Sequence, residues 1–163
     1  MKVRRSNRLV DMTRYLMEHP RTLVSLKFFG ERYGSAKSSI SEDLSIIRRT
    51  LHTWGVGRLE TLPGASGGAR LTLLYSEENA AQVIDDLVKA VDDDSRLLPG
   101  GYVYLSDLLG RPDVLREVGR LIATQYVDDD VDVVMTVETK GIPIAQSVAM
   151  YLNKPFVIVR NSS

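Results

Sequence analysis

The sequence predicts a two-domain α/β protein, with a basic helical first half and an acidic second half built around a parallel sheet. Residues 1–74 hold 13 Lys and Arg against 6 Asp and Glu, a net charge of +7, and their apolar residues recur largely at helical spacing. Residues 75–163 hold 8 bases and 15 acids, a net charge of −7, and contain the continuous apolar runs typical of parallel strands. The expected domains are therefore 1–74 and 75–163, and the basic domain is expected to face a polyanion.

Composition sets broad limits on the class of protein. The 163 residues include 44% hydrophobic and 26% charged side chains, which is ordinary for a globular chain of one large or two small domains. No apolar run approaches 18 residues in the sequence, and the basic start has no apolar signal core, so we expect neither a membrane span nor secretion. The sequence has no cysteine, which excludes disulfides and thiolate metal sites and favours a cytoplasmic protein.

Three helices are expected in the basic half. The first begins near Ser6, as its N-cap, and ends at about His19; the second follows Ser25 and ends at Gly34. The third spans Ser35 to Trp54 and carries one apolar stripe at steps of four, three and four. This stripe consists of Ile40, Leu44, Ile47 and Leu51. Two alternating segments, 58–63 and 69–75, follow as strands around the glycine-rich turn 63–68.

The side of the third helix opposite this stripe indicates what the basic half contacts. It carries short hydroxyls around one acid and one long base, at Ser35, Ser38, Glu42, Ser45 and Arg49. Short side chains let a helix enter the major groove of DNA, about 12 Å wide, whereas a solvated face more often carries Lys and Glu pairs. Taken alone, the helix fits a solvated face and a DNA contact equally. Three helices followed by a hairpin is the order of a winged helix-turn-helix, and together with the charge it favours DNA.

The residues expected to contact DNA come from three segments. A basic arm at the N-terminus would contact phosphates, and the third helix would contact the base edges of DNA. One arginine of a hairpin strand would make a further phosphate contact. The expected set is Lys2, Arg4, Arg5, Arg8, Ser35, Lys37, Ser38, Ser39, Glu42, Arg49 and Arg70. For the arm, the alternative is a frayed and solvated chain end.

The acidic half is expected to contain a β-loop-α-β unit. Helices are predicted over 77–91 and from Pro112 onward, with a short strand-like piece at 102–104 between them. A buried parallel strand over 131–137, a helix over 143–152 and a second buried strand over 156–159 follow. The turn Glu138-Thr139-Lys140-Gly141 would aim backbone N–H groups, a hydroxyl and an ammonium at one point, which suits a phosphate or pyrophosphate. Many such turns contain these residues, so a plain βα turn is the alternative.

Two long stretches resemble a known family over essentially the whole chain. SAKSSISEDL and LPGGYVYL…VDVVMTVETKGIP…VIVR are similar to the purine-operon repressors of Gram-positive bacteria. The resemblance implies a winged helix joined to the first part of a type I phosphoribosyltransferase-like effector domain without catalytic turnover. It implies a homodimer that binds double-stranded DNA of purine operons and phosphoribosyl pyrophosphate, with guanosine tetraphosphate-type nucleotides as competitors. It implies no cofactor, no metal and no membrane.

Motif by motif, the resemblance implies an effector site on the second domain. Its residues would be Tyr102, Glu138, Thr139, Lys140, Gly141 and Arg160. The family's ribose-phosphate signature of four apolar residues, an acidic pair and a small-residue loop is expected downstream of Arg160, beyond the last residue, Ser163. The acids at 128–130 do not match this signature because they precede a strand instead of following one.

Two other functions remain as alternatives. One alternative is a phosphoribosyltransferase with a basic extension. The other is an RNA-binding module fused to a metabolic domain. No side chain is an evident acid or base for catalysis at a nucleobase, and an enzyme would leave the +7 charge of the first half unexplained. We therefore expect a DNA-binding transcriptional repressor of purine biosynthesis genes, and not an enzyme.

Overall fold

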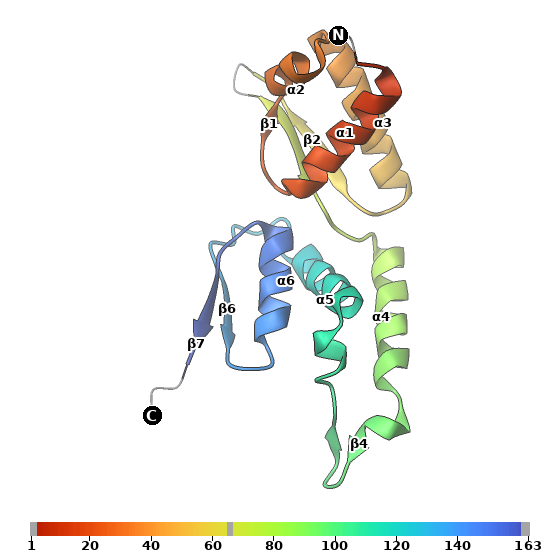
Figure 1. Ribbon diagram of the computed structural model, residues 1–163, viewed down its shortest axis with the longest axis vertical. Coiled ribbons are helices and arrows are strands. Elements are labelled where there is room, and N and C mark those ends of the chain that lie inside the picture. Colours follow the sequence, from red (N-terminus) through yellow and green to blue (C-terminus); the bar gives the residue numbers. More distant parts are fainter. Residues whose placement is uncertain (1–2, 65–66, 161–163) are drawn as a thin grey trace. The chain divides into compact units, whose positions relative to one another are not determined.

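The computed structural model describes residues 3–64 and 67–160. The chain divides into two compact units, an N-terminal unit of residues 1–74 and a C-terminal unit of residues 75–163 (Figure 1). Both mix helices with small sheets, so the chain is of the α/β type. No helix of the described ranges is long and apolar enough to cross a membrane.

The N-terminal unit has the predicted order of three helices and a hairpin, with one additional short strand. Strand β3 lies in the middle of a three-stranded sheet and pairs antiparallel with β1 and β2. The elements are α1 (Arg5–Glu18), β1 (Val24–Ser25), α2 (Leu26–Tyr33), α3 (Lys37–Thr53), β2 (Arg58–Leu62) and β3 (Gly68–Thr72). Ala65 and Ser66, at the predicted hairpin tip, lie outside the described residues.

Local sequence explains where α1 and α2 begin and end. The Oγ of Ser25 accepts a hydrogen bond from the backbone N–H of Phe28 at 3.1 Å, and so caps α2 as predicted. Gly34 ends this helix in the left-handed conformation, with φ of 59°, which glycine adopts at little cost. The predicted start of α1 was wrong: the helix begins at Arg5 without a side-chain cap, and Ser6 lies inside it.

The core of the N-terminal unit forms where the helices meet the sheet. All four residues of the predicted stripe of α3 are buried, which confirms that assignment. Met12 and Leu16 of α1 and Phe29 of α2 are wholly buried in the same cluster. Met17, which follows Leu16 in the sequence, is 49% exposed, so the buried face of α1 is narrower than its apolar residues suggest.

A polar cluster joins α1 to α2 at the surface. The carboxylate of Asp11 accepts hydrogen bonds from Arg32 Nε at 2.7 Å, Arg14 Nη2 at 2.9 Å and the Tyr33 hydroxyl at 2.9 Å. These bonds, that of Arg32 first, hold the pKa of Asp11 well below its ordinary value. Burial, followed by the bond to Asp11, raises the pKa of Tyr33 to about 12. The charged form of Asp11 therefore stabilises the packing of α2 on α1.

Over residues 75–160 the C-terminal unit contains two hairpin strands, three α-helices, two short 3-10 helices (Asp94–Arg96 and Leu108–Gly110) and a two-stranded parallel sheet. Its elements are α4 (Glu77–Val91), β4 (Leu97–Leu98), β5 (Tyr102–Val103), α5 (Pro112–Gln125), β6 (Val134–Val137), α6 (Ile142–Leu152) and β7 (Phe156–Val159). Helices α5 and α6 approach closely because Gly119 leaves room for Ser147, whose hydroxyl donates to the Leu115 carbonyl at 2.7 Å. Ala123, Val148 and Leu152 form the small core beneath this contact.

The β-loop-α-β unit is present, but its strands are less buried than predicted. Strand β6 begins at Val134 instead of 131 and pairs in parallel with β7. Met135 and Val137 are 66% and 65% exposed, and Val157 and Val159 of β7 are 46% and 41% exposed. Nearly continuous β-branched sequence therefore correctly indicated parallel pairing and wrongly indicated burial on both faces, because one face is uncovered in the described chain.

Helix α4 also differs in burial. Its bounds are those predicted, and the Ser76 hydroxyl caps it by accepting from the Asn79 N–H at 3.2 Å. However, none of its residues is buried, although Ala80, Val83 or Ile84, Leu87 and Val91 were expected as its apolar stripe; Ile84 and Val91 are 48% and 41% exposed. The periodicity of the sequence located the helix without showing what covers it.

The Asp11 cluster gives a pH-dependent prediction. Because the pKa of Asp11 is lowered on folding, its stabilising effect is full above the unfolded pKa of about 3.9 and is lost as the pH falls through the folded value. We expect Asp11→Asn to reduce the free energy of unfolding by about 1–3 kcal/mol at pH 7, the usual range for hydrogen bonds to a charged group. The difference from wild type should shrink below about pH 4 in urea titrations.

The matched control for this test is Glu31→Gln. Glu31 makes an exposed ion pair with Lys27 at 3.7 Å, which should contribute at most about 0.5 kcal/mol. A loss for Asp11→Asn that is the same at pH 3 and pH 7 would contradict a role for the charged carboxylate.

Candidate functional site

The polar face of α3 lies on the surface, opposite the buried stripe. Ser38, Glu42, Ser45 and Arg49 are exposed, as is Lys37 in the first turn. Two other expected contact residues are less accessible: Ser39 is half-buried, and Ser35, also half-buried, precedes the helix. Where the exposed face of a helix carries small hydroxyls, its backbone can approach a groove closely.

A buried carboxylate connects α1 to this helix. Asp43 is wholly buried, and its two oxygens accept from Arg5 Nε at 2.9 Å and from Arg8 Nε at 2.8 Å. Arg5 also donates from Nη2 to the carboxylate of Glu42 at 3.3 Å. Arg8 donates from Nη1 to the backbone carbonyl of Val3 at 3.1 Å. The network therefore runs from the start of the described chain to the polar face of α3.

This network corrects the expected role of Arg8. Arg8 is only 7% exposed and is paired with Asp43, so it does not lie on the surface where a phosphate would reach it. Asp43 itself was absent from the predicted site. A signal was present, because Asp43 lies three residues after Ile40 and four before Ile47, at the edge of the apolar stripe. An acid at that position needs a buried partner, and Arg8 lies four residues before buried Met12 on α1.

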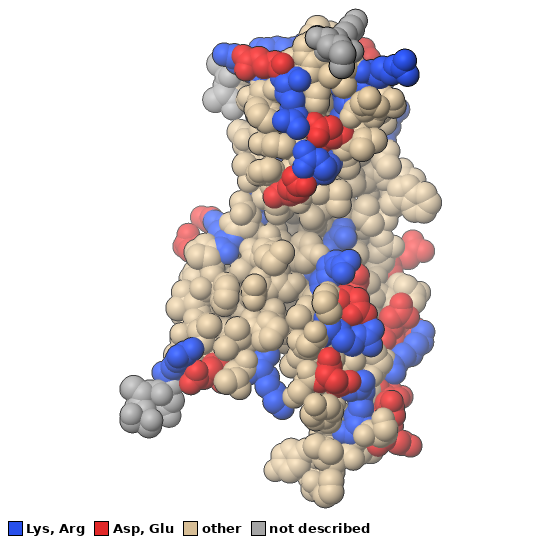
Figure 2. All heavy atoms as spheres, in the orientation of Figure 1, with Lys and Arg blue, Asp and Glu red and all other residues tan. Residues whose placement is uncertain are grey.

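The remaining basic residues of the expected DNA contact set differ in their environment. Arg4 is exposed, and Lys2 lies outside the described residues. Arg70 on β3 pairs with Glu60 on β2 at 3.0 Å, so its charge is partly balanced within the hairpin. On the face drawn in Figure 2, Lys and Arg of the N-terminal unit lie among Asp and Glu. Although the net charge of this unit is positive, the face drawn in Figure 2 is therefore not uniformly basic.

The hairpin is fixed to α3 by a different arginine. Arg48 Nε donates to the Leu59 carbonyl at 2.9 Å, and its Nη2 donates to the Thr61 hydroxyl at 2.7 Å. These bonds set the position of β2 relative to the helix, so the hairpin and the polar face of α3 form one rigid surface.

The turn between β6 and α6 brings together most of the expected effector residues. The Glu138 N–H donates to the Val159 carbonyl at 3.2 Å, and Arg160 Nε lies 3.0 Å from Glu138 Oε2. Gly141 allows the turn to approach Thr136, because a Cβ at position 141 would collide with the Thr136 hydroxyl. The turn, called here the β6–α6 loop (residues 138–141), therefore has Arg160 as its neighbour.

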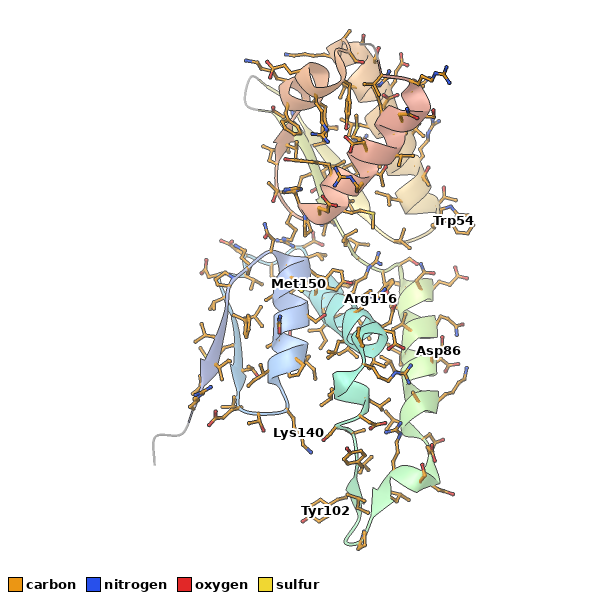
Figure 3. All side chains as sticks on the ribbon, in the orientation of Figure 1. Trp54, Asp86, Tyr102, Arg116, Lys140 and Met150 are labelled. Atoms are coloured by element: carbon orange, nitrogen blue, oxygen red, sulfur yellow. The ribbon has the colours of Figure 1, made fainter. Side chains whose placement is uncertain are left out.

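The loop also has features that suit an anion. Thr139 and Lys140 are exposed, and in the described chain Lys140 makes no ion pair. Helix α6 begins directly after Gly141 without a side-chain cap; its Ile142 N–H donates to the Thr139 carbonyl at 3.3 Å, and Pro143 has no N–H. Figure 3 shows Lys140 at this start of α6. An exposed ammonium on the turn between a strand and a helix is an arrangement that suits a phosphate.

Tyr102 was expected beside this loop. It lies on β5 with 72% of its surface exposed, on a separate hairpin (Figure 3). The cavity of about 420 Å³ that borders the loop is lined by Thr136, Gly141 and apolar residues of α5, β6 and α6, and not by Tyr102. The described residues form no His, Asp and Glu cluster able to hold a metal ion.

Comparison with known proteins gives a consistent assignment for the N-terminal unit. Residues 4–72 match the family described as bacterial purine repressor, N-terminal. The whole chain is 52% identical to the purine biosynthesis transcriptional repressor PurR of Bacillus subtilis and covers 57% of it. Over 97% of the chain, it is 49% identical to the purine biosynthesis transcriptional activator PurR of Lactococcus lactis subsp. lactis, covering 58% of that protein.

A shorter similarity involves an enzyme. The chain is 39% identical over 59 residues to the orotate phosphoribosyltransferase of Methanocaldococcus jannaschii, which is 36% of this chain and 33% of the enzyme. The chain thus spans a little over half the length of the curated regulators it matches and only a third of this enzyme.

Proposed function

We propose that this chain, whose residues 4–72 match the bacterial purine repressor family, is the DNA-binding and effector-sensing part of a transcriptional repressor of purine biosynthesis genes. One observation supports this proposal most directly. Helix α3 buries one stripe in the core and leaves short hydroxyls, one acid and one arginine exposed beside a hairpin fixed to it by Arg48. This is the surface that a winged helix-turn-helix presents to a major groove.

The proposed DNA contacts divide by chemistry. Ser38 and Ser45 let α3 approach base edges, and the carboxylate of Glu42 can accept from the amino group of cytosine. Positive charge for phosphate contacts comes from Arg4 and Arg5 of the N-terminal segment, and from Lys37 and Arg49 of α3. Lys2 remains part of the proposed set, Arg70 would contact phosphate only if it left Glu60, and Arg8 is not part of it.

The C-terminal unit is proposed to sense phosphoribosyl pyrophosphate. The β6–α6 loop offers backbone donors of Thr139 and Gly141, the ammonium of Lys140 and, after release from Glu138, the guanidinium of Arg160. A guanosine tetraphosphate-type nucleotide also carries a pyrophosphate, so it would compete for the same donors. Tyr102 would join such a site only if its hairpin moved toward the loop.

We further propose that the protein acts in the cytoplasm as a homodimer. A two-fold symmetric dimer can contact two half-sites of DNA at once.

The enzyme alternative has less support. Relatives that match 97% or more of the chain are named as regulators, whereas the similarities to two phosphoribosyltransferases cover 36% and 50% of the chain. A turnover assay with phosphoribosyl pyrophosphate and free bases should therefore give no product.

Ser38→Ala tests the DNA surface. Because Ser38 is exposed, the substitution should change the free energy of unfolding by no more than about 0.5 kcal/mol. It should nevertheless weaken binding to control DNA of purine biosynthesis genes in a gel-shift titration. Buried Leu44→Ala is the matched control on the same helix and should cost about 2–5 kcal/mol of stability. The proposal fails if the wild type binds this DNA no better than random duplex DNA.

Lys140→Ala tests the effector loop. Lys140 is exposed and makes no ion pair in the described chain. Its removal should therefore lower the affinity for phosphoribosyl pyrophosphate without unfolding the unit. By linkage, if a variant does not bind the effector, the effector no longer changes the DNA affinity of that variant. DNA titrations with and without effector should therefore differ for the wild type and coincide for Lys140→Ala. Lys154→Ala, at the other end of α6, is the control, and identical effector responses in wild type and Lys140→Ala would contradict the assignment.

A further inference from the structure

Asp43 is the only acid in the buried set of the described residues, and its burial requires an explanation. Both carboxylate oxygens are occupied by guanidinium groups, so the charge is fully paired. However, a buried ion pair often adds no more stability than a well-packed apolar pair of similar size. Stability alone is therefore a weak reason for a carboxylate at this point of the core.

The two arginines that bind Asp43 have different surroundings. The side chain of Arg8 is 8% exposed and also holds the Val3 carbonyl, so it is enclosed within the unit. The side chain of Arg5 is 51% exposed and extends from Asp43 to Glu42, whose side chain is 69% exposed. Asp43 thus has one partner that closes the core and one partner at the surface of α3.

The surface partner keeps most of its binding capacity. A guanidinium has five N–H donors, and the bonds to Asp43 and Glu42 use one at Nε and one at Nη2. The other three donors make no hydrogen bond among residues 3–64 and 67–160, and can bind a phosphate or a base edge. An arginine held in place by a buried acid loses less conformational freedom on binding than one that moves freely.

We propose that Asp43 is a positioning residue for DNA binding, which holds Arg5 of α1 beside the polar face of α3 so that both contact the same DNA segment. This inference rests on the proposed function of α3. It assigns Arg5 a fixed place next to Glu42 instead of a place on a mobile arm. It also makes the contribution of Arg5 to DNA binding dependent on a residue that does not touch DNA.

The test is a double-mutant cycle on DNA binding. Wild type, Arg5→Ala, Asp43→Asn and the combined variant of the purified protein are titrated onto a fluorescein-labelled random-sequence duplex at several salt concentrations. Random DNA measures phosphate contacts and requires no operator sequence. In the wild-type background, Arg5→Ala should lower the slope of log affinity against log salt by about one unit. In the Asp43→Asn background, the same change should leave the slope unaltered.

Arg49→Ala provides the matched control. Arg49 is exposed on the same helix and has no contact with Asp43 among the described residues, so its effect on affinity and slope should be equal in both backgrounds. Equal effects of Arg5→Ala with and without Asp43 would overturn the proposal. A wild type that does not bind duplex DNA would instead refute the proposed function, so the two failures are distinguishable.

Loss of Asp43 leaves Arg8 buried without its acid, and circular dichroism must first show that Asp43→Asn is folded. If it is not folded, the paired change Arg8→Met with Asp43→Leu replaces both buried charges by apolar groups of similar volume. This pair takes the place of Asp43→Asn in the cycle. The expected and the contradicting outcomes stay the same.

Discussion

The pairing of buried Asp43 with Arg8 is the constraint on which the N-terminal unit depends. A carboxylate without contact with water is tolerated only when its charge is matched and its lone pairs are occupied. Arg8 meets that requirement from α1, and so fixes the distance and the rotation of α1 relative to α3. Burial of the apolar stripe of α3 stabilises the core but is not directional. The Asp43–Arg8 ion pair is directional, and so it favours one arrangement of α1 on α3.

The arginines of the N-terminal unit show why net charge alone does not describe a DNA-binding surface. Arg8 closes the core, Arg48 holds the hairpin to α3, Arg32 joins α2 to Asp11, and Arg70 pairs across the hairpin. The basic side chains that extend from the unit without an ion pair among the described residues are fewer, with Arg4, Lys37 and Arg49 the clearest examples. Many of the 13 basic side chains of residues 1–74 therefore stabilise the fold, and fewer of them are available to a polyanion.

Sequence periodicity predicted what depends on neighbours in the chain. It located the stripe of α3, the cap at Ser25, the bounds of α4 and the parallel pairing of β6 with β7, because each follows from local spacing. It could not predict which face another element covers, and so the strands β6 and β7 were expected to be more buried than they are. It also placed Arg8 at the surface, because the charge that binds it lies 35 residues away. The local pattern shows that Asp43 needs a buried partner, but packing decides which charge supplies it.

The central claim is that the exposed face of α3 lies in the major groove of DNA. Methylation interference tests it directly, because dimethyl sulfate modifies guanine N7 in the major groove and adenine N3 in the minor groove. The purified protein would be bound to partially methylated control DNA of purine biosynthesis genes, and the bound and free fractions would then be cleaved and compared. The account predicts that methylation of a few guanines at N7 prevents binding. Interference confined to adenine N3, or none at either position, would contradict it.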